Sequence, residues 1–283
     1  MSVTPSLLLE PTFWRQPLAG RMRQFAELRE QGAVLPVEVD NPMTETTEVF
    51  HALTRYDEIV EVSKRPEEFC SGKGAVSIFD MPMEMLEFFG SFINMDNPRH
   101  ANQRRIVAHS FTPTQLQGVL DSVETICTEV IDGFCERGEV DLVEVLSQPF
   151  PLLVICDMMG IPRSEFQTVL DATNVILSGG DAEFIGDGDP MAAYLNSGIA
   201  LSTLMGELIE ERRKNPTDDL TSKLVHNDLP EDELTPAEIT SFFVLLAVAG
   251  NDTTRTAISH GVNPVSYTHL RAHETVLVIS YAV

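Results

Sequence analysis

Two short segments of the chain carry side chains whose types and spacing could do chemistry. In the first, DNPRHANQRR at residues 96–105, His100 and Arg104 stand four positions apart. In a helix both would lie on one face, and arginine offers a planar, bidentate donor that suits carboxylates. The pair could therefore bind acidic groups of a ligand, and a solvated basic face is the alternative interpretation.

The second segment, AGNDTT, interrupts an apolar run, FFVLLAV. Burying an unpaired carboxylate is costly and glycine weakens a helix interior, so the interruption needs a reason. One interpretation is that Gly250 ends one helix and Asn251 or Asp252 caps the next. The other is a single helix that passes an active site, where Gly250 lets a flat ligand approach and Asp252 and Thr253 handle protons.

The composition excludes several classes of partner. The 283 residues include 19 basic and 43 acidic side chains, which gives a net charge of −24. Such a polyanion repels phosphate backbones and anionic lipids, so we expect no nucleic-acid and no membrane partner. No apolar run is long enough to cross a bilayer. Because the cysteines show no CxxC pairing and the start lacks signal-peptide features, we expect a cytoplasmic protein with reduced thiols. We also expect a monomer.

The elements that must position these side chains are mainly helices. Residues 33–39 and 48–54 read as a small β-hairpin, and Thr54 is expected to cap the short helix that follows. From residue 97 onward the apolar periodicity predicts helices: one opening at Pro98 with Asn97 as cap, others over 112–138, 141–162 and 163–177, one ending within 206–216, and one starting at a Thr235–Glu238 capping box. The predicted fold class is mainly α with a small β-sheet.

Four segments together resemble bacterial cytochromes P-450. MDNPRHANQRRIVAHSFTP (95–113) is similar to that family's Asp-x-Pro-x-His-x-x-x-Arg helix motif before Phe-Thr-Pro. AGNDTT is similar to its Ala-Gly-x-Asp/Glu-Thr-Thr oxygen-activation motif. NPTDDLTSKLV (215–225) and PFPLLVICDMMGIP (149–162) resemble a loop and the central helix of the family, in the expected order. The resemblance runs from about residue 10 to 262, and it implies the N-terminal two thirds of the P-450 fold.

The resemblance implies a haem-dependent monooxygenase that inserts one oxygen atom of O2 into an apolar small molecule, with steroid or terpenoid skeletons as the expected substrates. Haem b would be the cofactor, with its propionates held by His100 and Arg104. Ala249 and Gly250 would pass over the distal face of the haem. Asp252 would relay protons during oxygen activation together with Thr253.

The resemblance also implies a pocket and redox partners. Residues 71–92, rich in Met and Phe, fit either an irregular core loop or the wall of an apolar pocket, and the resemblance favours the pocket. The expected pocket residues are Leu246, Ile78, Phe79 and Met83. Ferredoxin and ferredoxin reductase are the expected electron donors, with Arg99 and Arg105 as a local basic docking patch.

The sequence departs from the family where the iron ligand should stand. No cysteine lies in a Phe-x-x-Gly-x-x-x-Cys-x-Gly setting; the four are Cys70, Cys127, Cys135 and Cys156. We therefore expect no metal ligand in this chain and no activity from it. The family's Glu-x-x-Arg helix is also absent, and Glu210 and Arg213 match those letters only on a charged, exposed helix.

The last residues bear no resemblance to the family. Pro264 is expected to break the helix, and 263–283 is predicted to be a non-native tail after a P-450-like domain over 1–262 that is C-terminally truncated. His269 and His273 could mimic a metal pair but lack a third ligand.

Two other functions fit parts of the sequence. A non-catalytic α-helical ligand-binding protein would need no iron ligand. A class I terpenoid synthase is suggested by DDLTS and NDTTRTAIS, but Arg255 stands where that motif needs Ser or Thr.

Overall fold

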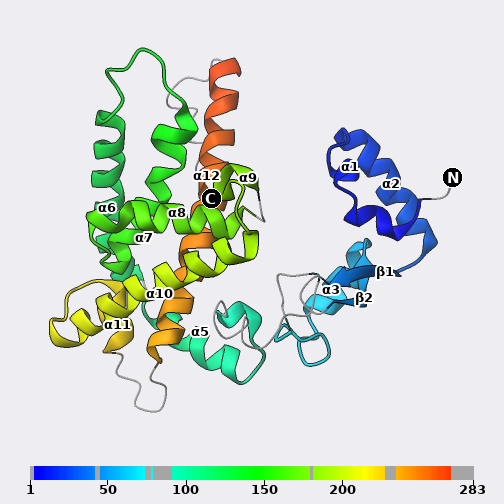
Figure 1. The fold of residues 1–283 in the computed structure, drawn as a ribbon, viewed down its shortest axis with the longest axis horizontal. Coiled ribbons are helices and arrows are strands. Elements are labelled where there is room, and N and C mark those ends of the chain that lie inside the picture. Colours follow the sequence, from blue (N-terminus) through cyan, green and yellow to red (C-terminus); the bar gives the residue numbers. More distant parts are fainter. Residues whose placement is uncertain are drawn as a thin grey trace. The chain divides into compact units, whose positions relative to one another are not determined.

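A computed structural model describes most of the chain (Figure 1). The described residues are 3–41, 45–73, 78, 91–111, 113–178, 181–226 and 234–268, without the side chains of 113–117 and 263–268. The predictions for Phe79, Met83, His269 and His273 lie outside them. Contacts divide the chain into two compact units, Met1–His100 and Ala101–Val283. Among the described helices, none combines the length and the apolar character that crossing a membrane requires.

The first unit joins short helices to a two-stranded sheet. Its elements are η1 (Pro5–Leu9), α1 (Pro11–Trp14), α2 (Leu18–Gln31), β1 (Val34–Asn41), β2 (Thr46–Leu53), α3 (Tyr56–Ser63) and η2 (Phe92–Asn94). The strands pair antiparallel with Val34 opposite Leu53, so the predicted hairpin is confirmed. Leu35 and Val37 point inward and are buried, as the alternation of a strand requires.

One predicted helix cap in this unit is wrong, and one predicted helix starts a residue later than expected. The N-cap of α3 is Arg55, without a side-chain hydrogen bond, and the hydroxyl of Thr54 is buried without a partner among the described residues. Thr54 directly follows β2 and lies one residue too early to reach the first N–H groups of the helix. The helix α5 (Arg99–His109) begins one residue after Pro98.

The second unit is entirely helical in its described part. Besides α5 it contains α6 (Pro113–Asp132), a π-helical turn η3 (Val143–Ser147), α7 (Pro149–Met159), η4 (Arg163–Glu165), α8 (Phe166–Leu177), α9 (Ala182–Ile185), α10 (Pro190–Lys214), α11 (Leu220–Val225) and α12 (Pro236–Thr268). Helix α6 ends before Gly133, earlier than predicted. Its Leu120 is 59% exposed, so the apolar stripe of this helix is only partly used. The fold class, mainly α with a small sheet, is confirmed.

The long helix α12 packs against η3, α7, α8 and α10 (Figure 1). Its predicted capping box is confirmed, because Thr235 Oγ1 accepts the N–H of Glu238 at 3.2 Å and Glu238 Oε2 accepts the N–H of Thr235 at 2.9 Å. The helix continues unbroken through Gly250, so the C-cap interpretation of that glycine is wrong. It also continues past Pro264, contrary to prediction, since a proline removes only one N–H donor and a helix can continue around it.

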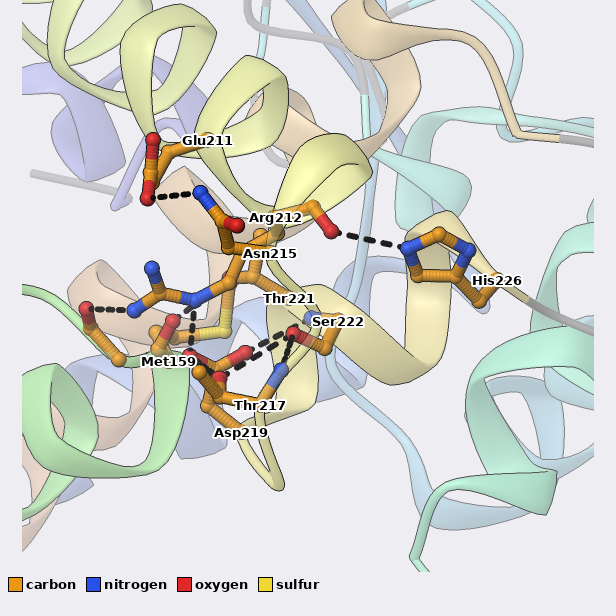
Figure 2. A network of polar contacts seen from close by, with 10 residues as sticks. Met159, Glu211, Arg212, Asn215, Thr217, Asp219, Thr221, Ser222 and His226 are labelled. Carbon is orange, nitrogen blue, oxygen red and sulfur yellow. Dashed lines mark hydrogen bonds and ion pairs between the residues drawn. The ribbon is translucent and has the colours of Figure 1, made fainter.

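Asp219 ties three helices of this unit together. Its carboxylate accepts hydrogen bonds from Arg212 Nε at 2.5 Å, the Thr217 hydroxyl at 2.6 Å and the backbone N–H of Ser222 at 2.7 Å (Figure 2). Arg212 Nη2 also donates to the carbonyl of Gly160 at 2.9 Å. The C-terminal end of α7, the end of α10 and the start of α11 therefore form one polar junction.

The same junction explains the segment NPTDDLTSKLV in structural terms. The Thr221 hydroxyl donates to the carbonyl of Met159 at 2.6 Å, which satisfies one of the orphan carbonyls at the end of α7. Asp218 is 97% exposed and pairs with Lys223. The two aspartates are thus used for capping and an ion pair, and the structure offers no support for a diphosphate-binding motif here.

Burial alone would raise the pKa of the Asp219 carboxyl, but the hydrogen bonds from Thr217, Ser222 and Arg212 outweigh it and hold the pKa below its usual value. A carboxylate with a lowered folded-state pKa stabilises the fold above its unfolded-state pKa, and that stability is lost as pH falls through the folded-state pKa. We expect the free energy of unfolding to fall between about pH 5 and pH 2, and to fall less in Asp219→Asn, measured by urea titration. Asp218→Asn is the exposed control and should keep the parent profile; equal profiles for all three proteins would contradict the expectation.

Candidate functional site

An open stripe of three side chains runs along the middle of α12. Leu246, Ala249 and Thr253 follow one another at three- and four-residue spacing, which places them on one face. Leu246 is half-buried, while Ala249 and Thr253 are exposed. The opposite face is buried and includes Val244 and Ala247. Among the described residues, this part of α12 is thus buried on one side and more exposed on the other.

The Thr253 hydroxyl has a fixed orientation on this stripe. Its Oγ1 donates to the carbonyl of Ala249 at 2.8 Å, the back-bond to residue i−4 that threonine makes in helices. Because the hydroxyl proton is used in this bond, the oxygen lone pairs remain available as acceptors. Thr253 can therefore receive a hydrogen bond from a molecule lying on the stripe.

Asp252 does not share this stripe. It lies about 100° around the helix from Thr253, and its Oδ1 forms an ion pair with Arg255 Nη2. Both side chains are partly exposed. The carboxylate of Asp252 is therefore engaged through one oxygen by Arg255, a partner that the motif alone did not reveal.

Gly250 and Asn251 face the packed side of α12. A Cβ at Gly250 would lie 3.0 Å from Ile155 Cδ1, so glycine here permits close packing of α12 against α7. Asn251 is fully buried, and neither atom of its amide has a hydrogen-bond partner among the described residues. Sequence reasoning missed both roles; the available signal for Asn251 was a lone amide on an otherwise apolar helix face.

Helix α5 carries the basic residues predicted to bind carboxylates. Along it, His100 and Arg104 are separated by one turn. The His100 ring is half-buried, with its centroid 6.1 Å from that of Phe92. Arg104 is exposed and forms no ion pair with any described residue, in a chain with 43 acidic side chains. Arg99 and Arg105 are exposed on the same helix.

Within the first unit, a cavity of about 630 Å³ borders His100. Its wall includes Cys70, Ser71, Phe92 and Asp96. The Asp96 carboxylate accepts the backbone N–H groups of Ser71 and Gly72 at 2.7 and 3.0 Å. Ile78, a predicted pocket residue, is 48% exposed and does not line this cavity.

The cysteines do not form a metal centre in the described part of the chain. Burial raises the pKa of the Cys156 thiol to about 12, so this side chain is a neutral core residue on α7. Cys70 and Cys135 are exposed. No group of three or more His, Cys, Asp or Glu side chains gathers among the described residues in a way that could hold a metal ion.

Comparison with known proteins assigns this chain and its fold to a family. No family model matches, but both curated and solved relatives agree, and the chain belongs to the cytochrome P450 superfamily. It is 41% identical over 219 residues to the methyl-branched lipid omega-hydroxylase of Mycobacterium tuberculosis, covering 76% of this chain and 50% of that protein. It is 32% identical over 214 residues to the steroid C26-monooxygenase of Mycolicibacterium smegmatis, covering 74% and 49%.

A solved structure gives the same assignment. Mycobacterium marinum cytochrome P450 CYP268A2, in complex with pseudoionone, matches with a TM-score of 0.79 and 35% identity, over 94% of this chain and 66% of that chain. The chain spans about half the length of the curated relatives it matches.

Proposed function

We propose that the chain is part of a haem-dependent monooxygenase that inserts one oxygen atom of O2 into an apolar lipid, either methyl-branched or steroidal. The observation that carries the proposal is the 41% identity over 219 residues to a methyl-branched lipid omega-hydroxylase; the exposed Thr253 on α12, with its hydroxyl held on the Ala249 carbonyl, supports it. The relatives' names, a methyl-branched lipid omega-hydroxylase and a steroid C26-monooxygenase, suggest the substrate class.

The residues of this chain fit a haem group. Ala249 is small enough to leave room for a flat macrocycle against α12, and Arg104 has a guanidinium without a carboxylate partner among the described residues. We assign the propionates to Arg104 and His100, whose one-turn spacing on α5 suits two neighbouring carboxylates. Haem, when bound, supplies the iron chemistry that activates dioxygen.

The side chains around this stripe have distinct tasks. Leu246 presents an apolar surface to the substrate. Thr253 accepts a hydrogen bond near the reacting oxygen while its own hydroxyl proton is donated to the Ala249 carbonyl. Asp252 exchanges protons with solvent, and its ion pair with Arg255 orients the carboxylate. Gly250 keeps α12 against Ile155 and thereby holds the stripe in place.

Electron donors and chain boundaries complete the proposal. Arg99 and Arg105 form an exposed basic patch on an acidic protein, which suits docking of an acidic ferredoxin that receives its electrons from a reductase.

We also propose that the P450 portion is residues 1–262 and that 263–283 is foreign to it. Sequencing the genomic DNA beyond the codon for Val262 tests this proposal. A genomic reading frame that encodes residues 263–283 would contradict it.

Oxygen insertion is tested by supplying a full-length protein that carries residues 1–262 with ferredoxin, its reductase, O2 labelled with 18O, and a methyl-branched fatty acid or a steroid. We expect a hydroxylated product with one labelled atom, detected by mass spectrometry. The 283-residue chain is the matched control, and it should give neither product nor a thiolate–carbon monoxide absorption band, because none of its cysteines lies in the haem-ligand motif. Unlabelled product, or that band in the control, would contradict the proposal.

A further inference from the structure

A hydrogen bond joins the two helices that carry the proposed haem residues. Gln103 Nε2, on α5, donates to Glu238 Oε1, on α12, at 2.5 Å. Gln103 is 7% exposed, and its partner is 135 positions away in the sequence. A buried amide needs such a partner, so the bond constrains how the two helices lie against each other.

Glu238 is oriented by contacts other than its hydrogen bond with Gln103. Its other carboxylate oxygen, Oε2, accepts the N–H and the hydroxyl of Thr235 at 2.9 and 3.0 Å. The capping box therefore fixes the side chain at the start of α12, where the helix dipole also favours a negative charge. Gln103 binds to an oriented acceptor rather than to a mobile one.

The bond determines which way Arg104 points. The buried face of α5 consists of only three residues, Gln103, Ile106 and Val107. With so short an apolar face, packing alone defines the rotation of α5 weakly, and the directional bond from Gln103 adds the missing constraint. Arg104, the next residue, is thereby turned to the exposed side.

The face of α12 that receives α5 is also the face of the open stripe. The ring of Phe111, just after α5, meets that of Phe242 edge-on with centroids 6.3 Å apart, so α5 contacts α12 at Glu238 and the residues just after α5 contact it again at Phe242. At about 100° per residue, Glu238 and Phe242 fall in the same arc of about 60° as Ala249 and Thr253. The helix that carries Arg104 therefore packs on the same face of α12 that carries Thr253.

From this geometry we propose that Gln103 is a positioning residue, which sets the orientation of Arg104 toward the haem face of α12 through Glu238. The inference rests on the proposed haem site. Gln103 itself touches neither the cofactor nor the substrate in this proposal, and it acts only through the placement of α5.

A reciprocal swap tests the hydrogen bond in the 283-residue chain. Gln103→Glu places two carboxylates face to face, and we expect backbone hydrogen exchange in α5 to accelerate about tenfold, measured by mass spectrometry. The double variant Gln103→Glu/Glu238→Gln restores a carboxylate–amide pair and should restore slow exchange. Asn102→Glu adds the same charge on the exposed side and should change nothing. Unchanged exchange in Gln103→Glu, or no rescue by the swap, would overturn the inference.

Haem titration of the full-length apoprotein separates this inference from the proposed function. We expect Gln103→Glu to weaken haem affinity several-fold, as Arg104→Ala does, and the swap to recover it. If Arg104→Ala weakens binding and Gln103→Glu does not, the positioning role is refuted and the haem site stands. If neither variant weakens binding, the proposed propionate site itself fails, and the inference fails with it.

Discussion

Gly160→Ala is expected to abolish stable folding of the second unit. Gly160 ends α7 with φ of 75°, a left-handed conformation that costs an L-residue about 1–2 kcal/mol. The larger effect is steric, because a Cβ would lie 1.9 Å from Asp219 Oδ2 and 2.9 Å from Arg212 Nη2. That ion pair is largely buried, with side chains 15% and 9% exposed, so it cannot move aside without losing its partners.

The expected cost follows from which contacts must break. Displacing Asp219 separates it from Arg212, and breaking a buried pair costs about 3–5 kcal/mol. The total approaches the whole stability of an ordinary domain, about 5–15 kcal/mol. We expect most of the variant to be insoluble, and the soluble remainder to unfold at much lower urea concentration, followed by circular dichroism.

Two further variants identify the collision as the cause. Gly138→Ala adds a Cβ that meets nothing within 4 Å, and it should leave the urea midpoint near that of the parent. In an Asp219→Ala background the main obstacle is gone, so adding Gly160→Ala should cost less than it does in the parent chain. Strict additivity of the two substitutions would show that the collision with Asp219 is not responsible.

Local patterns predicted the elements that depend on neighbours in sequence. The hairpin follows from alternating residues such as Leu35 and Val37. The start of α12 follows from the Thr235 capping box. In each case the interactions that define the element lie within a few residues, so the sequence alone contains the cause.

The interactions that assemble the helices were not predictable in this way. In the sequence Gln103 is only a polar residue between His100 and Arg104. Its contact with Glu238 exists only in the folded chain. Arg212 likewise reads as part of a charged helix end, although its guanidinium reaches the carbonyl of Gly160. Such contacts depend on how helices pack, and neither periodicity nor capping rules contain that information.

The oxygen-activation motif contains both features that the sequence predicted and features that only the fold reveals. The family resemblance selected Thr253, and the structure gives it a defined hydrogen bond on an open face. The same motif suggested that Gly250 serves a flat ligand, whereas its described neighbour is Ile155 on α7. Asp252 was selected for its carboxylate, but its ion pair with Arg255 was not anticipated, because an i, i+3 pair forms only where the helix continues through the motif.

In the full-length protein, Thr253→Ala should separate oxygen consumption from product formation. The variant keeps the small, open stripe but loses the hydroxyl oxygen that accepts a hydrogen bond beside the Ala249 carbonyl. Without that acceptor, proton delivery near the reacting oxygen is no longer directed. We expect oxygen uptake to continue while product per O2 falls about tenfold or more, within the range that positioned proton-transfer groups contribute, and the missing oxygen should appear as hydrogen peroxide.

The hydroxyl and its position are tested separately. Thr253→Ser keeps an oxygen that can bond the Ala249 carbonyl, so coupling should stay near that of the parent. Thr254→Ala removes an exposed hydroxyl one position further on, about 100° around α12 and away from the stripe, and it should leave coupling unchanged. Oxygen uptake and peroxide are followed with an electrode and a peroxidase assay, and product is followed by mass spectrometry. If Thr253→Ala stays coupled, or Thr254→Ala uncouples equally, then the back-bonded hydroxyl does not direct the proton, and the role of the stripe reduces to shape alone.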